Sequence, residues 1–280
     1  MNLKCALDIM KSKSLVACIN FKKVKLEVHV LANIFDIGLV SPPRPRFLVN
    51  SGNEYLVSTA LPYFPRGGLP RVNNVLGGPG SWQMSSSWGG MSAGDNMIYP
   101  AQTIDGGLAQ RCPDLATWIR EHVPPVSWDT RAEDERPGPR LRRLHLTRDS
   151  VRCETGGCVW SPVTEAGKGD LATDFSLGVL HTVAPYDSDP DRDQRLAECY
   201  SNCLKVADTI TLSTGTSLSI VTCLLGTGVK CIDRALSAAI LRERLDTIND
   251  DAFNDNECSV ELVLQSEQIF SEVLPVLGHQ

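Results

Sequence analysis

The stretch SLSIVTCLLGTGVKCIDRALSAAILRERLDTI, residues 217–248, contains the pattern that decides the fold. It begins with a nearly continuous apolar run, which is typical of a strand buried on both faces of a parallel sheet. A short loop containing Gly226 and Gly228 follows, and a helical pattern begins near Asp233. A buried strand that leads directly into a helix is the repeating unit of α/β proteins.

The flanking sequence repeats this alternation. Strands are predicted in KVKLEVHVLA (23–32), RFLVN (46–50), CVWSPVTE (158–165), LGVLHTVAPY (177–186) and SVELVL (259–264). Helices are predicted in the second part of 105–123, over 191–209 and over 266–277. We therefore predict an α/β fold with a mostly parallel sheet that helices cover on both faces.

Two long segments interrupt the alternation. Residues from about 62 to 103 are rich in Gly, Pro, Ser, Asn and aromatic side chains, and residues 129–149 are densely charged with two prolines. The first segment is either a functional loop or a disordered insertion, because loops of this length inside a domain are usually one or the other. The second is read as an exposed loop whose charges are solvated.

Charge and hydropathy limit the classes of function. The net charge of −6 argues against a general nucleic-acid binder, which would carry a basic face to gather phosphates. Lysines interrupt residues 1–30, so no secretory signal is expected. No run approaches the roughly 20 apolar residues that cross a bilayer. We expect a soluble protein of the cytoplasm or the nucleus that does not contact a membrane.

The cysteines are expected to be reduced and structural. The chain has ten, and several lie in apolar segments, among them Cys18, Cys199, Cys203 and Cys223. Thiols in such surroundings usually pack in a core. Cys153 is not at a zinc-binding spacing from the next cysteine, so no metal site is predicted.

Two loops lie where an α/β sheet binds its ligands, at the carboxyl ends of strands. Gly226–Cys231 follows the buried strand and precedes a helix, so its backbone N–H groups could hold a phosphate. Asn50 and Asn53 follow the strand RFLVN, and their amides could read sugar hydroxyls. The alternatives are an ordinary strand-to-helix turn and turn-forming asparagines.

A third element is Ile104–Gly107, which enters a helical segment. The carboxylate of Asp105 could orient water or bind a hydroxyl, and the amides of the two glycines could face a diphosphate. The alternative is that Asp105 is a helix N-cap. His181 lies within a predicted strand and is expected to be structural.

Together these segments resemble the motifs of macro domains, in the same order. Residues 50–53 resemble the family's VNAAN, IDGGLA (104–109) its VDGAIH, and LHTVAP (180–185) its IHTVGP. VRCETGGCVWSPV (151–163) is similar to the segment with Cys-Pro-Thr-Gly-Glu-Ala, and RLAECYSNCLKVAD (195–208) to the LxxCYxxxLxxA helix. LLGTGVKCIDRALSAAIL (224–241) is similar to STGIYGFP and the helix after it. The resemblance covers about residues 24–275.

The resemblance implies a three-layer α/β/α macro-domain-like fold with a mixed, mostly parallel central sheet. Residues 24–280 then form a single domain that carries the insertion at about 62–103 and the charged loop at about 129–149. Residues 1–23 are expected to be an N-terminal extension. The implied partner is ADP-ribose or an ADP-ribosylated protein, and no cofactor is implied.

The resemblance also assigns site residues. Asn50 and Asn53 would contact the distal ribose, with Asn50 and Asp105 at the catalytic positions of hydrolytic members. Gly106 and Gly107 would approach the diphosphate. The second phosphate loop would contain Gly226, Thr227, Gly228, Val229 and Lys230.

This chain departs from the family pattern at three positions. Lys230 replaces the aromatic residue often placed over the distal ribose, and Cys231 replaces the glycine after it. At the adenine-reading position, the family's Gly-Asp-Ile is Ala32-Asn33-Ile34 here, so either Asn33 or Asp36 would take the role of the family aspartate.

Three functions are compatible with the sequence. The first is binding of ADP-ribose with hydrolysis of an ADP-ribosyl bond, and the second is binding without turnover. The third is a non-catalytic partner-binding protein that has kept the macro fold and lost the pocket.

Overall fold

The structure is a computed structural model of the 280-residue chain. It describes residues 15–54, 56, 64–65, 97–98, 103–126, 151–163, 170–211, 217–228, 230–248, 252–253 and 257–278. Most of the predicted insertion at 62–103 and the whole charged loop at 129–149 lie outside the described residues. Two short strands of the insertion, β4 (Phe64–Pro65) and β5 (Met97–Ile98), pair with each other in antiparallel orientation.

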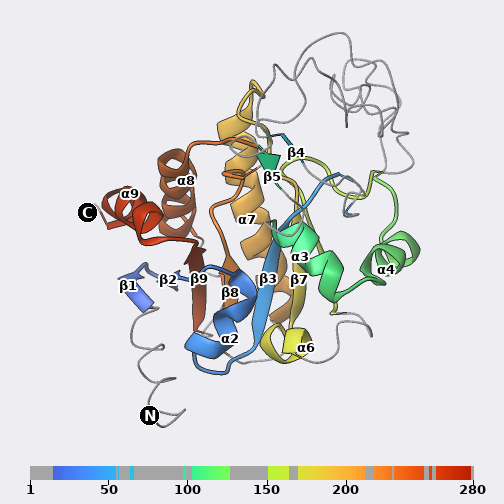
Figure 1. The fold of residues 1–280 in the computed structure, drawn as a ribbon, viewed down its shortest axis with the longest axis horizontal. Coiled ribbons are helices and arrows are strands. Elements are labelled where there is room, and N and C mark those ends of the chain that lie inside the picture. Colours follow the sequence, from blue (N-terminus) through green and yellow to red (C-terminus); the bar gives the residue numbers. More distant parts are fainter. Residues whose placement is uncertain are drawn as a thin grey trace.

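A seven-stranded sheet forms the centre of the molecule (Figure 1), in the order β1-β2-β9-β8-β3-β7-β6. Its strands are β1 (Leu15–Asn20), β2 (Val24–Val30), β3 (Arg46–Ser51), β6 (Cys158–Ser161), β7 (Gly178–Thr182), β8 (Leu218–Thr222) and β9 (Cys258–Leu264). The five inner strands are mutually parallel, whereas β1 and β6 are antiparallel edge strands. The carboxyl ends of the inner strands therefore share one edge of the sheet.

Helices cover both faces of the sheet, which confirms the predicted three-layer α/β/α architecture. One apolar core joins the sheet to α7 (Arg192–Thr211), α8 (Arg234–Asp246) and α9 (Glu267–Gly278). A second core joins the opposite face to η1 (Ile34–Asp36), α2 (Ile37–Val40), α3 (Ile104–Arg111), α4 (Leu115–His122) and α6 (Asp170–Asp174). Alternation along β3 separates the cores, because Phe47 and Val49 enter the first and Leu48 the second.

The strands and helices predicted from periodicity are present, but the sheet extends further toward the N-terminus than expected. β1 lies within residues 1–23, which the sequence assigned to an extension, and pairs with β2 from Leu15↔His29 to Asn20↔Lys25. Its apolar residues are interrupted by exposed positions, as suits an edge strand.

Buried ion pairs join β2, β3 and β9 on the α2 face. Arg46 donates from Nε to Oε1 of Glu261 over 2.9 Å, and both side chains are almost completely inaccessible to solvent. Arg44 bonds Glu27 and also lies 3.2 Å from Oε1 of Glu261. Burial raises the pKa of the Glu261 carboxyl, but hydrogen bonds from Ser219 and Ser41 and the two guanidinium charges outweigh it and lower the pKa.

The expectation that the cysteines pack in the core is confirmed in part. All nine cysteines among the described residues are free thiols, and Cys112, Cys153, Cys199, Cys203 and Cys258 are buried. Cys18 is exposed, which corrects the expectation for this residue: it lies on β1, an edge strand of the sheet that the described residues form. None of the helices in the described part of the chain combines the length and apolar character that a membrane span requires.

We expect Glu261→Gln to lower the free energy of unfolding by about 3 kcal/mol, because it leaves the buried Arg46 guanidinium without its anion. Urea unfolding followed by circular dichroism measures the loss. The double variant Arg46→Met/Glu261→Leu removes both charges and should recover most of the stability. A single variant as stable as the wild type would show that this pair does not hold β3 against β9.

Candidate functional site

The carboxyl end of β3 is tied to the start of α3 by one hydrogen bond between side chains. Asn50 donates from Nδ2 to Oδ1 of Asp105 over 3.0 Å, across 55 positions of sequence. Gly52 packs against this pair, since a Cβ atom there would lie 3.5 Å from both the Asn50 amide nitrogen and the Asp105 carboxylate. The two residues predicted at catalytic positions are therefore in contact.

The environment of Asp105 shifts the pKa of its carboxyl above that of an exposed aspartate. Burial raises the pKa of its carboxyl, while the hydrogen bond from Asn50 and the positive charge of Lys230 lower it without cancelling the effect. The residue as a whole is nevertheless only half-buried. A carboxylate with a raised pKa can accept a proton more readily than an ordinary aspartate.

Thr103, rather than Asp105, caps α3. Its Oγ1 accepts the N–H of Gly106 over 3.0 Å, and its carbonyl accepts the N–H of Gly107. The alternative reading of Asp105 as an N-cap is therefore wrong, because a residue of the first turn does not take that position. Both glycine N–H groups already have acceptors within the chain, which limits what they can donate to a diphosphate.

Gly107 is required for packing. A Cβ atom at this position would lie 2.7 Å from Cε2 of Phe35, so the ring of η1 rests directly on the backbone of α3. The guanidinium of Arg111 lies over the same Phe35 ring, 4.1 Å from its centroid. η1 and α3 are thus neighbours at the same edge of the sheet.

The loop after β8 keeps its backbone N–H groups available. Gly226 and Gly228 accept hydrogen bonds through their carbonyls, from Ile232 and Cys231. The N–H groups of Gly226, Thr227 and Gly228 have no acceptor among the residues that the structure describes. β8 is the direct neighbour of β3, so these donors lie at the strand end next to Asn50.

The two glycines of this loop have different roles. Gly226 has φ +77°, in the left-handed region, and a Cβ atom there would meet Cδ1 of Ile232 at 2.5 Å. At Gly228, which is exposed, a Cβ atom would meet nothing within 4 Å among the described residues. Gly226 therefore shapes the turn, whereas Gly228 leaves open space beside the loop.

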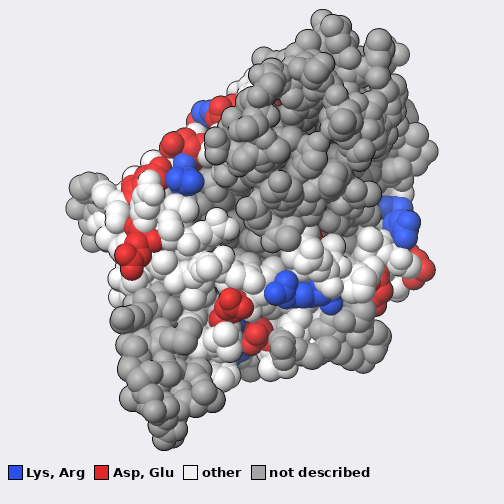
Figure 2. Space-filling model, in the orientation of Figure 1, with Lys and Arg blue, Asp and Glu red and all other residues white. Residues whose placement is uncertain are grey.

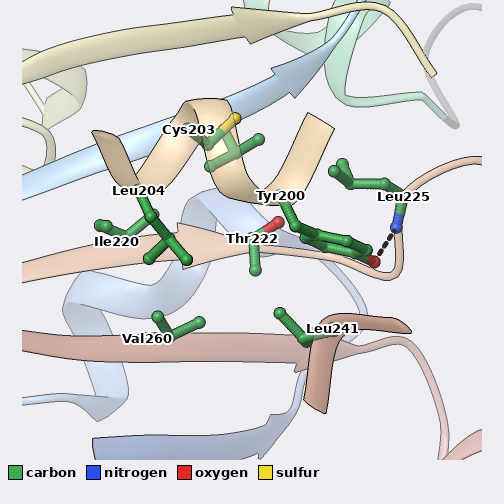
Figure 3. A pocket seen from close by; sticks show the side chains of 9 residues that line it. Tyr200, Cys203, Leu204, Ile220, Thr222, Leu225, Leu241 and Val260 are labelled. Atoms are coloured by element: carbon green, nitrogen blue, oxygen red, sulfur yellow. Dashed lines mark hydrogen bonds between the residues drawn. The ribbon is translucent and has the colours of Figure 1, made fainter. Parts of the chain in front are cut away.

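Tyr200 of α7 fixes the start of the loop from beneath (Figure 3). Its hydroxyl accepts the N–H of Leu225 over 2.9 Å and lies 2.8 Å from Oγ of Ser237, which donates to the Leu225 carbonyl. The remainder of the ring lines a small apolar cavity with Val260 and Leu241. Because that cavity is apolar and lies within the core, it is a packing feature and not the ligand site.

Lys230 links this loop to the rest of the site. It is buried, its Nζ lies 4.0 Å from the centroid of the Tyr186 ring, and its charge acts on Asp105. The sequence pointed to Lys230 as the replacement of an aromatic residue. It did not reveal that Tyr186, from the segment after β7, provides an aromatic ring beside it.

The other predicted positions are placed as follows. Oδ1 of Asn33 accepts the N–H of Phe35 over 3.2 Å and caps η1, which leaves its amide nitrogen as the group that could meet a base. Ile34 belongs to the apolar core of the α2 face. Asn53 follows Gly52 in the loop after β3, and its carbonyl accepts the N–H of Leu56. Val229 lies outside the described residues.

One group of buried side chains in the described chain has the composition of a metal site, namely Glu27, His29 and Glu261. It belongs to the ion network of the fold. Both oxygens of Glu27 are already bound by Lys25 and Arg44, and Arg46 bonds Glu261. The positive charges of Lys25, Arg44 and Arg46 already balance the two carboxylates, so we interpret the group as an internal charge network.

Comparison with known proteins gives a family match to part of the chain and a similarity in fold to solved structures. A family model described as Macro domain matches residues 140–241. No curated protein matches the chain.

Three solved structures of the Oceanobacillus iheyensis macrodomain are similar to this chain over 93% of its length. A glycine-to-valine variant with ADPR is 18% identical, is covered over 96% and gives a TM-score of 0.51. The same macrodomain with ADP is 18% identical, is covered over 94% and also gives 0.51. An asparagine-to-alanine variant is 19% identical, is covered over 91% and gives 0.52. The predicted resemblance to macro domains is thereby confirmed: the fold is that of a macrodomain.

We expect Asp105→Asn to raise the free energy of unfolding at neutral pH. The raised pKa means that the folded state binds the carboxyl proton more tightly than the unfolded chain. The stability linked to this group is therefore complete below the ordinary value near 3.8 and is lost as pH rises through the folded pKa.

Urea unfolding at pH 3.5 and pH 7 tests this expectation. The free energy of unfolding of the variant, relative to that of the wild type, should be higher at pH 7 than at pH 3.5. Asp174→Asn serves as a control for general effects of removing an aspartate. If the Asp105 variant is less stable than the wild type at pH 7, the Asn50 bond and Lys230 outweigh the cost of burial.

Proposed function

We propose that this protein binds ADP-ribose, either free or attached to a protein, at the carboxyl edge of β3 and β8. The observation that carries the proposal is the row of N–H donors in the loop after β8, next to the Asn50–Asp105 pair. Successive N–H groups between a strand and a helix favour a phosphate. A carboxylate and an amide beside them suit the hydroxyls of a sugar. A nucleoside diphosphate joined to a sugar combines these groups.

The relatives support the choice of ligand, since the similar macrodomain structures are described as holding ADPR and ADP. The charge distribution supports a backbone-built anion site. On the face in Figure 2, acidic and basic residues of the described chain are interspersed and do not form a basic patch. Lys230 is the cation near Asp105, and the remaining attraction for a diphosphate would come from the loop N–H groups. We expect this function in the cytoplasm or the nucleus.

Hydrolysis of an ADP-ribosyl bond is the finer proposal, and the environment of Asp105 supports it. In this mechanism the carboxylate takes a proton from a water molecule, and the resulting hydroxide attacks the C1″ atom of the distal ribose or an ester carbonyl. The bond to the leaving group breaks and the proton returns to that group. Asn50 would hold the Asp105 carboxylate in place during the transfer.

Binding is tested with Gly228→Glu. The side chain finds open space, so the fold should tolerate it, while its charge repels the diphosphate. Two like charges about 4 Å apart near a surface cost roughly 1–4 kcal/mol, so the affinity for ADP-ribose should fall by between about fivefold and several hundredfold by calorimetry.

Gly228→Gln is the matched control, since it adds the same bulk without the charge and should weaken binding much less. Undiminished affinity of the glutamate variant would mean that the diphosphate binds elsewhere. If the wild-type protein shows no saturable binding, the chain has kept the fold without the pocket and acts through a partner protein.

Turnover is tested with Asp105→Asn on a mono-ADP-ribosylated protein. The amide can still accept the hydrogen bond from Asn50, but it cannot take a proton from water. The cleavage rate should fall about 100-fold or more, with the affinity for ADP-ribose changed less than about threefold. An unchanged rate would remove Asp105 from the mechanism. A wild-type protein that binds without any cleavage would be a reader of the modification.

A further inference from the structure

A row of polar side chains from three strands, β6, β7 and β3, forms a series of hydrogen bonds that ends at Asp105. Ser161 of β6 lies 2.9 Å from Nε2 of His181 on β7. Nδ1 of the same ring lies 3.3 Å from Nδ2 of Asn50, which in turn bonds Asp105. Asn50 and His181 are register partners on the neighbouring strands β3 and β7, so the sheet itself sets their spacing. Ser161, His181 and Asn50 are all at least 98% buried.

The direction of each hydrogen bond follows from the chemistry of the groups. The amide nitrogen of Asn50 can only donate, so Nδ1 of His181 must be the acceptor. The ring proton therefore sits on Nε2 and is donated to Oγ of Ser161. Burial lowers the pKa of His181 to about 4, which keeps the ring neutral at physiological pH. Only this neutral tautomer can both accept a hydrogen bond from Asn50 and donate one to Ser161.

The row determines which way the Asn50 amide faces. Its nitrogen donates one hydrogen to Asp105 and the other to His181, which uses its full donor capacity. A rotation of the amide by 180° would place its oxygen against the Asp105 carboxylate and the Nδ1 lone pair, both of which are acceptors. Oδ1 is thus held on the other side, where it is buried and has no hydrogen-bond partner among the described residues.

We propose that His181, held by Ser161, is a positioning residue that orients the Asn50 amide so that Oδ1 accepts a hydroxyl of the ligand. The proposal rests on the proposed binding of ADP-ribose, whose ribose hydroxyls are donors of this kind. It goes beyond the sequence-based expectation that His181 is structural. The buried Oδ1 acceptor supports the proposal, because leaving such a group without a donor costs stability.

Two amide replacements of His181 separate positioning from packing. The shorter side chain of His181→Asn places its amide near the former Nδ1, where its oxygen can accept from Asn50. The longer side chain of His181→Gln places its amide near Nε2, where it can meet Ser161 but not Asn50. Calorimetry should show that the glutamine variant binds ADP-ribose about tenfold more weakly than the wild type. The asparagine variant should bind within about threefold of the wild type.

Thr182→Val is the matched control. Thr182 is a buried neighbour of His181 whose Oγ1 donates to the carbonyl of Gly157. This variant should lose stability without losing affinity. In an Asn50→Ala background, His181→Gln should cause no further loss of affinity, because His181 acts through Asn50. Equal losses in both backgrounds, or wild-type affinity of the glutamine variant, would overturn the proposal.

A measurement without ligand keeps the proposal testable if a His181 variant fails to fold. Nitrogen NMR of the wild-type protein should show the His181 proton on Nε2 and an unprotonated Nδ1 at pH 7. A proton on Nδ1 would overturn the proposal directly. If the wild-type protein has this tautomer but does not bind ADP-ribose, the proposed function fails, and with it the hydroxyl acceptor role assigned to Oδ1.

Discussion

The hydrogen bond between Asn50 and Asp105 joins two parts of the chain that local sequence cannot bring together. It connects the end of a central strand to the first turn of α3, with the long insertion between them in sequence. The donor is fully committed, because His181 takes its second hydrogen. Because the Asn50 amide has no further hydrogen to donate, these two hydrogen bonds fix both the position of α3 and the direction of the Asn50 oxygen. The geometry of the candidate site depends on this one constraint.

The two faces of the sheet differ in chemical character, and this difference explains where the site lies. The face under α7, α8 and α9 is almost wholly apolar. The opposite face contains the Arg46–Glu261 network and, nearer the carboxyl edge, the Asn50–His181 pair. Buried polar groups are costly unless each finds a partner, so they are kept where they serve packing or binding. The network meets that condition in part, because Arg46 donates to Oε1 of Glu261 while Oε2 has no hydrogen-bond partner among the described residues. Oδ1 of Asn50 also has none there.

The sequence predicts the layers and the strand ends well, because both depend on local periodicity. The alternation in 23–32 and the apolar run in 217–226 locate β2 and β8 correctly. The contact between His181 and Asn50, on which its proposed role rests, could not be predicted in the same way. It depends on the register of β3 against β7, which pairs positions 131 residues apart. β1 was missed because an edge strand needs only one paired side and lacks the continuous apolar pattern of a central strand.

The N-cap residue Thr103 determines which groups at the start of α3 remain available to other partners. Since Thr103 caps α3, the Asp105 carboxylate is not needed for the helix start and is available to Asn50. The same cap uses the N–H groups of Gly106 and Gly107, so the start of α3 has little capacity left to hold an anion. Asp233 caps α8 after the loop that follows β8, but this cap uses the N–H groups of Leu236 and Ser237 and leaves those of Gly226, Thr227 and Gly228 available among the described residues. In the proposed site, the sugar would therefore be bound at the end of β3 and the phosphates at the end of β8, a division that the glycine content of the two loops alone could not reveal.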